Sequence, residues 1–226
     1  MIGALSAAVL AVSAANAVAQ TAQSTQVPPS KQVPAEAPLP IPKKSKIGPA
    51  APVTYDNKWE IYGGINFMNF MAGQNLAKRM NMGGTEILGT YWLTPKWGLG
   101  AEYRGEWGTT PVTPNIVFNG RALASLNGAL FGAQYRGPKN QYAALNYHAY
   151  AGPMYGKFDY TANPTVMGMY TNRWAPMVAL GGSVDINRSK NWAIRLSPDL
   201  ILEHFGTGTR EFFAISGGVV YRIGKR

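Results

Sequence analysis

The sequence predicts an all-β fold: an eight-stranded antiparallel up-and-down barrel that crosses a membrane, preceded by a disordered N-terminal segment. Three observations lead to this prediction. Segments after Trp59 alternate between apolar and polar residues, with the period of two that a β-strand requires. The connections between these segments alternate between short and long, and tryptophan and tyrosine stand near the segment ends.

The first 19 residues are predicted to form a cleaved signal peptide. They carry no charge and form an apolar run that closes with Ala17-Val18-Ala19, the small-x-small pattern that precedes a cleavage site. The run is short and rich in alanine, which argues against a transmembrane anchor. We therefore expect export, with Gln20 as the new N-terminus.

Residues 20–57 are predicted to form a disordered, proline-rich periplasmic segment. Eight of the 16 prolines of the chain lie between Pro28 and Pro52, and large apolar residues are scarce there. Such a segment cannot bury enough surface to offset the entropy of ordering, and repeated proline favours extended polyproline II. Two interpretations stay open: a solvated leader, or a tether that reaches the cell wall through its lysines.

The barrel domain is predicted to span residues 58–226. Its eight segments are residues 59–71, 84–93, 96–107, 123–136, 141–156, 173–186, 191–204 and 211–223. In the third segment Trp97, Leu99 and Tyr103 share one face. Glu102 and Arg104 share the other face, as the two sides of a barrel wall require.

The fourth segment is ambiguous, because Leu126 and Leu130 lie on the face that also carries Arg136. The connections indicate the orientation of the barrel. Short ones at 94–95, 137–140 and 187–190 alternate with long ones at 72–83, 108–122 and 157–172. Membrane barrels of even strand number have short periplasmic turns and longer external loops, so both chain ends should lie on the periplasmic side.

The charged residues of the segments predict the contents of the lumen. Cations inside the segments are arginines, whereas lysines are confined to the tail, loops, turns and strand ends. A narrow interior favours the planar guanidinium group, which pairs bidentately with carboxylates. The predicted ion-pair network of the lumen comprises Glu60, Glu86, Glu102, Arg104, Glu106, Arg136, Arg173, Asp185, Arg195, Asp199, Glu203 and Arg222. An eight-stranded interior is just wide enough for side chains to fill, so we expect a plugged polar lumen without an aqueous pore.

Alternation alone does not separate a membrane barrel from a soluble lipocalin-like carrier, because the apolar face of a carrier points inward. Aromatic residues near the segment ends favour the membrane, where they form interfacial girdles. These residues are Trp59, Trp97, Trp107, Tyr135, Tyr155, Trp174, Trp192 and Tyr221. A soluble periplasmic carrier of apolar ligands remains the third alternative.

Charge and composition exclude several function classes. The net charge is +10, but the cations are spread over the tail, loops and turns without an interleaved basic and aromatic platform, so nucleic acid is not an expected partner. The chain has no cysteine, which excludes disulfides and thiolate catalysis. No histidine cluster or phosphate-binding glycine loop is present. We predict neither a metal nor a cofactor.

The stretch from Trp59 to Ile223 resembles the small outer-membrane β-barrel superfamily of the OmpA and OmpX type. The closing segment from Ala214 to Ile223 looks like the terminal strand that the barrel-assembly machinery recognises, although Ile223 stands where an aromatic residue is usual. The resemblance implies a location in the bacterial outer membrane of a Gram-negative cell envelope. It also implies outer-membrane lipids and lipopolysaccharide as partners, and the assembly machinery during biogenesis.

One motif points to chemistry. The segment Glu203-His204-Phe205-Gly206-Thr207, followed by Glu211, resembles the His-x-Ser site of lipid A deacylases, but Gly206 stands at the serine position. Because Gly206 offers no hydroxyl, the nucleophile of a histidine-activated acyl transfer is missing. The other histidine, His148, is expected in a hydrogen-bonded lumen.

These observations favour a non-enzymatic, porin-like outer-membrane protein that serves envelope integrity or surface interaction through its external loops. A lipid A-modifying barrel enzyme that uses His204 is the alternative, with Thr207 or Thr209 as the nearest hydroxyls.

Overall fold

The computed structural model describes residues 53–225 apart from 75, 77, 113–119 and 161–163. The predicted signal peptide and most of the predicted proline-rich segment lie outside the described residues. Within the described part of the chain, no helix has the length and apolar character needed to span a bilayer.

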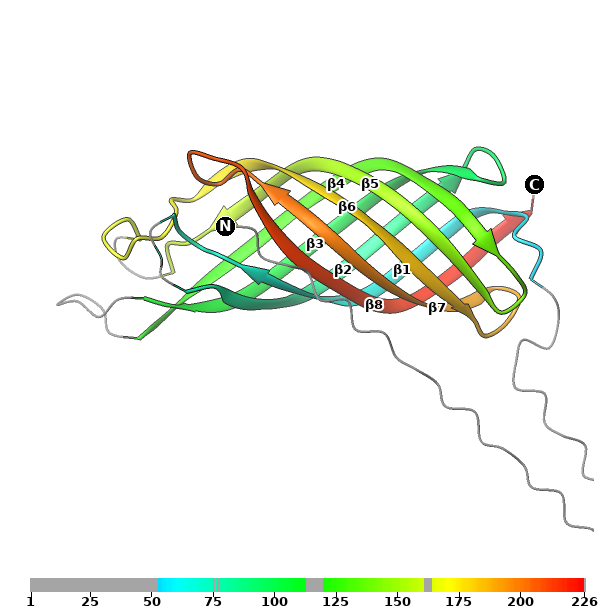
Figure 1. The fold of residues 1–226 in the computed structure, drawn as a ribbon, viewed down its shortest axis with the longest axis horizontal. Coiled ribbons are helices and arrows are strands. Elements are labelled where there is room, and N and C mark those ends of the chain that lie inside the picture. The colour runs from blue at the N-terminus through cyan, green and yellow to red at the C-terminus, as the bar shows by residue number, and fades with distance from the viewer. Residues whose placement is uncertain (1–52, 75, 77, 113–119, 161–163, 226) are drawn as a thin grey trace, which may run out of the picture. The chain divides into compact units, whose positions relative to one another are not determined.

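The described chain folds into a closed antiparallel barrel whose strands follow one another in sequence order (Figure 1). β1 pairs with both β2 and β8, so the sheet has no free edge. This architecture confirms the predicted fold class. The strands are β1 (Asn57–Phe70), β2 (Met80–Trp92), β3 (Trp97–Pro111), β4 (Arg121–Lys139), β5 (Ala143–Lys157), β6 (Arg173–Asn187), β7 (Trp192–Glu203) and β8 (Arg210–Lys225).

The second strand begins earlier than predicted, at Met80 rather than at residue 84. Met80 and Met82 are both buried, and the residues between and after them alternate with them. β2 therefore extends into residues 80–83, which were predicted to belong to the long connection 72–83.

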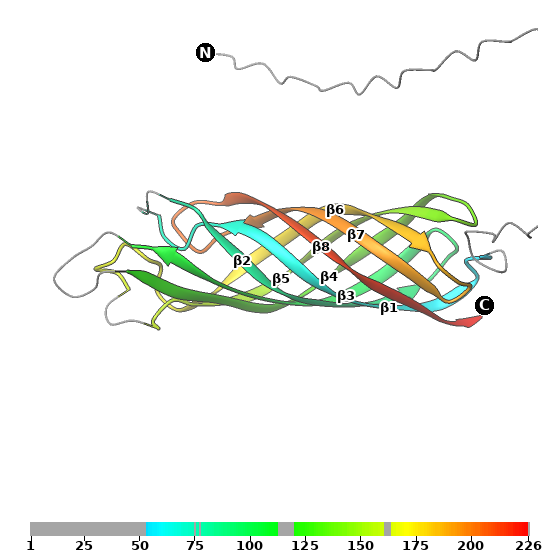
Figure 2. The same cartoon turned by 90° about the horizontal axis from the view of Figure 1, so that it is seen from below.

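The two ends of the barrel differ in their connections, as Figures 1 and 2 show. β1 begins and β8 ends at the same end, where Asn57 is paired with Lys225. The short turns 93–96, 140–142 and 188–191 lie at this end. The longer connections 71–79, 112–120, 158–172 and 204–209 lie at the other. By the rule for membrane barrels, the first is the periplasmic end and the second the external end.

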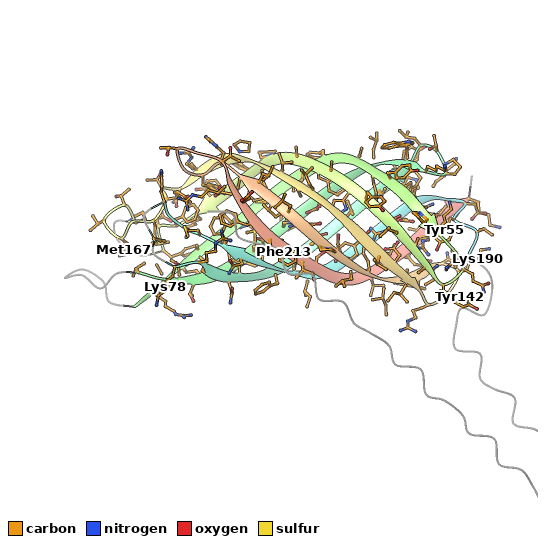
Figure 3. The ribbon with its side chains drawn as sticks, in the orientation of Figure 1. Tyr55, Lys78, Tyr142, Met167, Lys190 and Phe213 are labelled. Atoms are coloured by element: carbon orange, nitrogen blue, oxygen red, sulfur yellow. The ribbon has the colours of Figure 1, made fainter. Side chains whose placement is uncertain are left out.

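The outer surface of the barrel is apolar, and the interior holds charged groups. Ile65, Trp174 and Phe131 are 73%, 64% and 60% exposed, respectively. Figure 3 labels Phe213 on the same outer surface. Inside, Glu60 and Arg195 are buried. A water-soluble barrel has the opposite distribution, so the soluble carrier is excluded and the protein is a transmembrane barrel of the outer-membrane type.

Aromatic side chains mark the two membrane boundaries. Three pairs lie near the periplasmic end: Trp59 with Tyr91, Trp97 with Tyr135, and Trp192 with Tyr221, at ring-centroid distances of 4.6, 4.9 and 4.5 Å. Near the external end the rings of Tyr155 and Trp174 are 5.3 Å apart. Such rings are stable at the boundary between hydrocarbon and headgroups.

Candidate functional site

The periplasmic half of the lumen holds a cluster of ion pairs, which we call the periplasmic ion cluster. Its members are Glu60, Arg136, Asp185, Arg195 and Arg222. Arg195 donates from Nε to Asp185 Oδ1 at 2.6 Å, and its Nη2 lies 3.2 Å from Glu60 Oε2. Arg222 lies 3.3 Å from both carboxylates, and Arg136 pairs with Glu60. Each carboxylate thus contacts more than one guanidinium, which offsets the desolvation of the buried charges.

A second group, the central ion cluster, surrounds Arg104 farther along the lumen. Arg104 contacts Asp199 at 2.6 Å, Glu102 at 2.7 Å and Glu86 at 3.1 Å. The ring of His148 lies 2.9 Å from Asp199 through Nε2 and stacks on a tyrosine. His148 therefore belongs to the hydrogen-bonded lumen, as predicted.

Glu106 borders the central ion cluster, and Glu203 and Arg173 lie apart from both clusters. Glu106 is buried with its Oε1 4.0 Å from Arg104 Nη1, and neither of its carboxylate oxygens has a hydrogen-bond partner among the described residues. Glu203 is buried and accepts the main-chain N–H of Phe205 at 2.6 Å rather than pairing with an arginine.

The prediction is wrong for Arg173, which is exposed and donates to the carbonyl oxygen of His204 at 3.4 Å. It has the inward parity of β6 but is the first residue of that strand. It therefore lies at the external mouth, beyond the closed interior.

Tyr55 closes the periplasmic mouth of the barrel (Figure 3). Its hydroxyl donates to Asn140 O at 2.7 Å and accepts from Asn187 Nδ2 at 2.6 Å. The guanidinium carbons of Arg136 and Arg222 lie 5.2 and 5.0 Å from its ring centroid. Burial raises the pKa of Tyr55 above its ordinary value. The periodic segments do not reveal this residue, because it belongs to the predicted disordered segment.

The external half of the lumen is mostly apolar, although Glu203 is buried in it, which corrects the expectation of a polar lumen along the whole barrel. Its buried side chains form one cluster that includes Met68, Phe70, Met80, Met82, Leu126, Met154, Met177, Ile201, Phe205 and Phe212. Leu126 and Leu130 both point inward, which resolves the ambiguity of the fourth segment. The two leucines on the arginine face were the sequence signal for this apolar filling.

The external loops cover this apolar half. Phe158, Met167, Met169 and Tyr170 are buried within the same cluster. Tyr170 donates its main-chain N–H to the carbonyl of Ala72 at 2.9 Å, which ties two loops together. Burial raises the pKa of Tyr170 above its ordinary value. Side chains therefore close the lumen at both ends.

At the external end of the barrel, positively charged residues outnumber exposed acidic ones among the described residues. The positively charged residues of the loops and external strand ends are Lys78, Arg79, Arg121, Lys157, Arg173 and Arg210, and the exposed acids there are Asp159 and Glu211. The guanidinium of Arg79 lies 5.4 Å from the ring centroid of Phe212. This end of the barrel consequently has an electrostatic preference for anions.

The predicted deacylase-like motif lies at the external ends of β7 and β8. His204 Nδ1 is 3.2 Å from Thr209 Oγ1. The hydroxyl of Thr207 instead accepts from Gln74 Nε2 at 2.8 Å. Of the two hydroxyls considered, Thr209 is therefore the one placed beside the imidazole.

Several solved outer-membrane barrels are similar to this chain. Ail, the attachment invasion locus protein of Yersinia pestis, in complex with the heparin analogue sucrose octasulfate, is 18% identical with a TM-score of 0.49, over 74% of this chain and 99% of Ail. Neisserial surface protein A is 10% identical with a TM-score of 0.49, over 74% and 97%. OprG from Pseudomonas aeruginosa is 12% identical with a TM-score of 0.44, over 78% and 98%.

No family model matches the chain, and no curated protein sequence is significantly similar to it. At these identities the likeness concerns the fold alone. The membrane placement follows from the exposed apolar surface of the barrel itself.

Proposed function

We propose that the protein is a non-enzymatic outer-membrane barrel with a sealed lumen, and that it serves surface interaction at the cell envelope. The observation that carries this proposal is the filling of the lumen. The two ion clusters occupy the inner part, the apolar cluster occupies the outer part, and Tyr55 and the external loops cover the ends. A conducting channel needs a continuous aqueous path, and such a lumen provides none.

Planar-bilayer recording tests the sealed lumen. Purified barrel should show no steady porin-like current. Large and stable conductance steps from pure protein would overturn the proposal.

The external cations favour polyanionic partners, such as sulfated or phosphorylated polysaccharides. Lys78, Arg79 and Arg121 are exposed at the external end. Triple alanine substitution of these residues should lower the salt concentration at which the barrel elutes from immobilised heparin. The control is the double alanine variant of Arg188 and Lys190, in the periplasmic turn between β6 and β7. Elution of the triple variant, the control variant and wild type at the same salt concentration would argue against an external polyanion site.

A second candidate function is lipid A modification, because His204 Nδ1 lies 3.2 Å from Thr209 Oγ1. A general base next to a hydroxyl is the arrangement that nucleophilic acyl transfer requires. Under the proposed non-enzymatic function, His204→Ala leaves lipid A acylation unchanged in cells that overexpress the protein. Loss of an acyl chain with wild type, but not with His204→Ala or Thr209→Ala, would establish the enzyme.

We also infer that residues 1–19 are removed on export and that the following proline-rich segment stays in the periplasm. The apolar run before Ala17-Val18-Ala19 supports the first inference. The β8 sequence from Ala214 to Ile223 supports recognition by the assembly machinery. N-terminal sequencing of protein purified from outer membranes should start at Gln20, and an N-terminus at Met1 would refute cleavage.

A further inference from the structure

A pocket of about 290 Å³ lies inside the external mouth of the barrel, between three of the external loops. The connection 71–79 contributes Gln74, the connection 158–172 contributes Thr165 and Tyr170, and the connection 204–209 contributes Gly206 and Thr207. Ligand pockets commonly measure about 300–1,000 Å³. This pocket is therefore of a size for one small ring rather than for an extended chain.

Close contacts hold the three loops against one another. A Cβ atom at Gly73 would lie 1.9 Å from the carbonyl oxygen of Gly168, so only glycine permits this approach of the first loop to the second. Gln74 Nε2 donates to Thr207 Oγ1 at 2.8 Å and joins the first loop to the third. Walls that are already bonded to one another lose little conformational entropy when a ligand binds.

The pocket has an aromatic floor and a polar rim. Tyr170 and Phe205 form the floor, with both side chains buried and their ring centroids 6.2 Å apart. The rim carries exposed, neutral hydrogen-bonding side chains, which are those of Gln74, Thr165, Thr171 and Thr207. Apolar rings below several hydroxyl and amide groups are complementary to a sugar, whose ring has apolar C–H faces and a polar edge.

The hydroxyl of Tyr170 has no hydrogen-bond partner among the described residues, although the residue is only 7% exposed. This hydroxyl faces the bare side of Gly206, because a Cβ atom there would lie 3.3 Å from it. A buried tyrosine hydroxyl usually has a partner. A ligand that accepts a hydrogen bond from Tyr170 would therefore stabilise the pocket.

Arg173 provides the charge of the pocket, since it alone is ionised among the described side chains that line it. Its hydrogen bond to the carbonyl oxygen of His204 is long, at 3.4 Å, and the side chain is exposed. A guanidinium binds a carboxylate through two parallel hydrogen bonds. One cation among several neutral groups favours a ligand with a single negative charge, whereas a polysulfate or a phosphorylated lipid requires several cations.

We propose that this pocket binds one uronic acid residue of an acidic polysaccharide, with its carboxylate on Arg173 and its ring above the aromatic floor. Arg173 has the inward parity of β6, so the pocket opens to the exterior of the cell and not to membrane lipid. The inference rests on the proposed role in surface interaction and names the unit that is recognised. It does not use Lys78, Arg79 or Arg121, so its failure would leave the heparin elution result unaffected.

Titration by saturation-transfer difference NMR, with the barrel in a deuterated and sugar-free nonionic detergent, tests the ligand. Methyl glucuronide carries both the ring and the charge, methyl glucoside carries the ring alone, and acetate carries the charge alone. Methyl glucuronide should bind saturably and about tenfold more tightly than the other two, as expected for a charged hydrogen bond added to the ring contacts. Equal affinity for methyl glucoside or for acetate would overturn the assignment to a uronic acid.

Two glycines of one loop provide matched variants for the location of the site. Gly206→Leu fills the pocket, because a Cβ atom there already lies 3.3 Å from Tyr170 and 3.4 Å from Gln74. Gly208→Leu is the control, because a Cβ atom at that position meets no atom within 4 Å. Gly206→Leu should abolish saturable binding of methyl glucuronide, and Gly208→Leu should preserve it.

The carboxylate contact is tested separately. Arg173→Gln should lower the affinity for methyl glucuronide to that for methyl glucoside, whereas Arg121→Gln, at the same end of the barrel but outside the pocket, should leave it unchanged. Heat-modifiable gel migration verifies that each variant is folded. Wild-type affinity of folded Gly206→Leu or Arg173→Gln for methyl glucuronide would overturn the proposal.

Discussion

Replacement of Tyr55 tests whether the residue before β1 closes the periplasmic mouth. Tyr55→Ala removes two hydrogen bonds, to Asn140 and from Asn187, at 2.7 and 2.6 Å. A net hydrogen bond contributes about 0.5–1.5 kcal/mol. The variant also removes the ring from the guanidinium groups of Arg136 and Arg222, and a partly desolvated cation–π contact contributes about 0.5–2 kcal/mol. Taking central values for the two hydrogen bonds and the two cation–π contacts, we expect the free energy of unfolding to fall by about 4.5 kcal/mol.

The backbone of Tyr55 supplies a second, discriminating variant. Its φ is 56°, in the left-handed region, which costs a non-glycine residue about 1–2 kcal/mol. Tyr55→Gly loses the same side-chain contacts but relieves this strain, so it should be less destabilising than Tyr55→Ala by about 1 kcal/mol.

Equilibrium unfolding in urea, in detergent micelles, measures these differences. Tyr142→Ala is the control, because Tyr142 lies at the same end of the barrel and is 53% exposed (Figure 3). If Tyr55→Ala destabilised the barrel no more than Tyr142→Ala, Tyr55 would not close the mouth.

Three further predictions concern the lumen and its mouth. Arg104→Met leaves the carboxylates of the central ion cluster without their shared cation, so it should lower the free energy of unfolding by about 3–5 kcal/mol in urea titration; Arg188→Met, in an exposed turn, should have no such effect. Met154→Gln puts an unpartnered amide into the apolar half, where its cross-strand neighbours are Gly128 and Ala175, and should cost about 1–3 kcal/mol, whereas a cost near zero would indicate water there. Since burial raises the pKa of Tyr55, the folded state keeps a proton that the unfolded state releases above the ordinary pKa of 10.0, and stability should fall as pH rises through this window. Tyr55→Phe should therefore lose less stability than wild type between about pH 9 and about pH 11, and parallel losses would exclude a contribution from Tyr55.

The sequence predicted those parts of the barrel where one face meets lipid and the other a polar interior. β3 is such a case: its outer face carries Trp97 and Leu99, and its inner face carries Glu102 and Arg104. The period of two and the change of polarity coincide there. At the start of β2 this coincidence fails, because Met80 and Met82 point into the barrel while the polar Asn81 is exposed on the outer face. The pattern of an apolar outer face and a polar interior does not extend to these residues, so the start of β2 was missed.

Tyr55 could not be predicted for a different reason. Tyr55 reaches its partners Asn140 and Asn187 only after the barrel has closed, and no local pattern encodes contacts so distant in sequence.

The pairing of β1 with β8 has a consequence for biogenesis. Asn57 and Lys225 are partners, so the hydrogen bonds that close the sheet join the two ends of the barrel domain. Closure must wait until the last strand has left the ribosome and crossed the inner membrane. Contacts between such distant segments also make folding slow. Until then β1 and β8 both present unpaired main-chain edges, the feature that promotes aggregation. The barrel therefore gains a sheet without a free edge in a single last step, when its final strand pairs with its first.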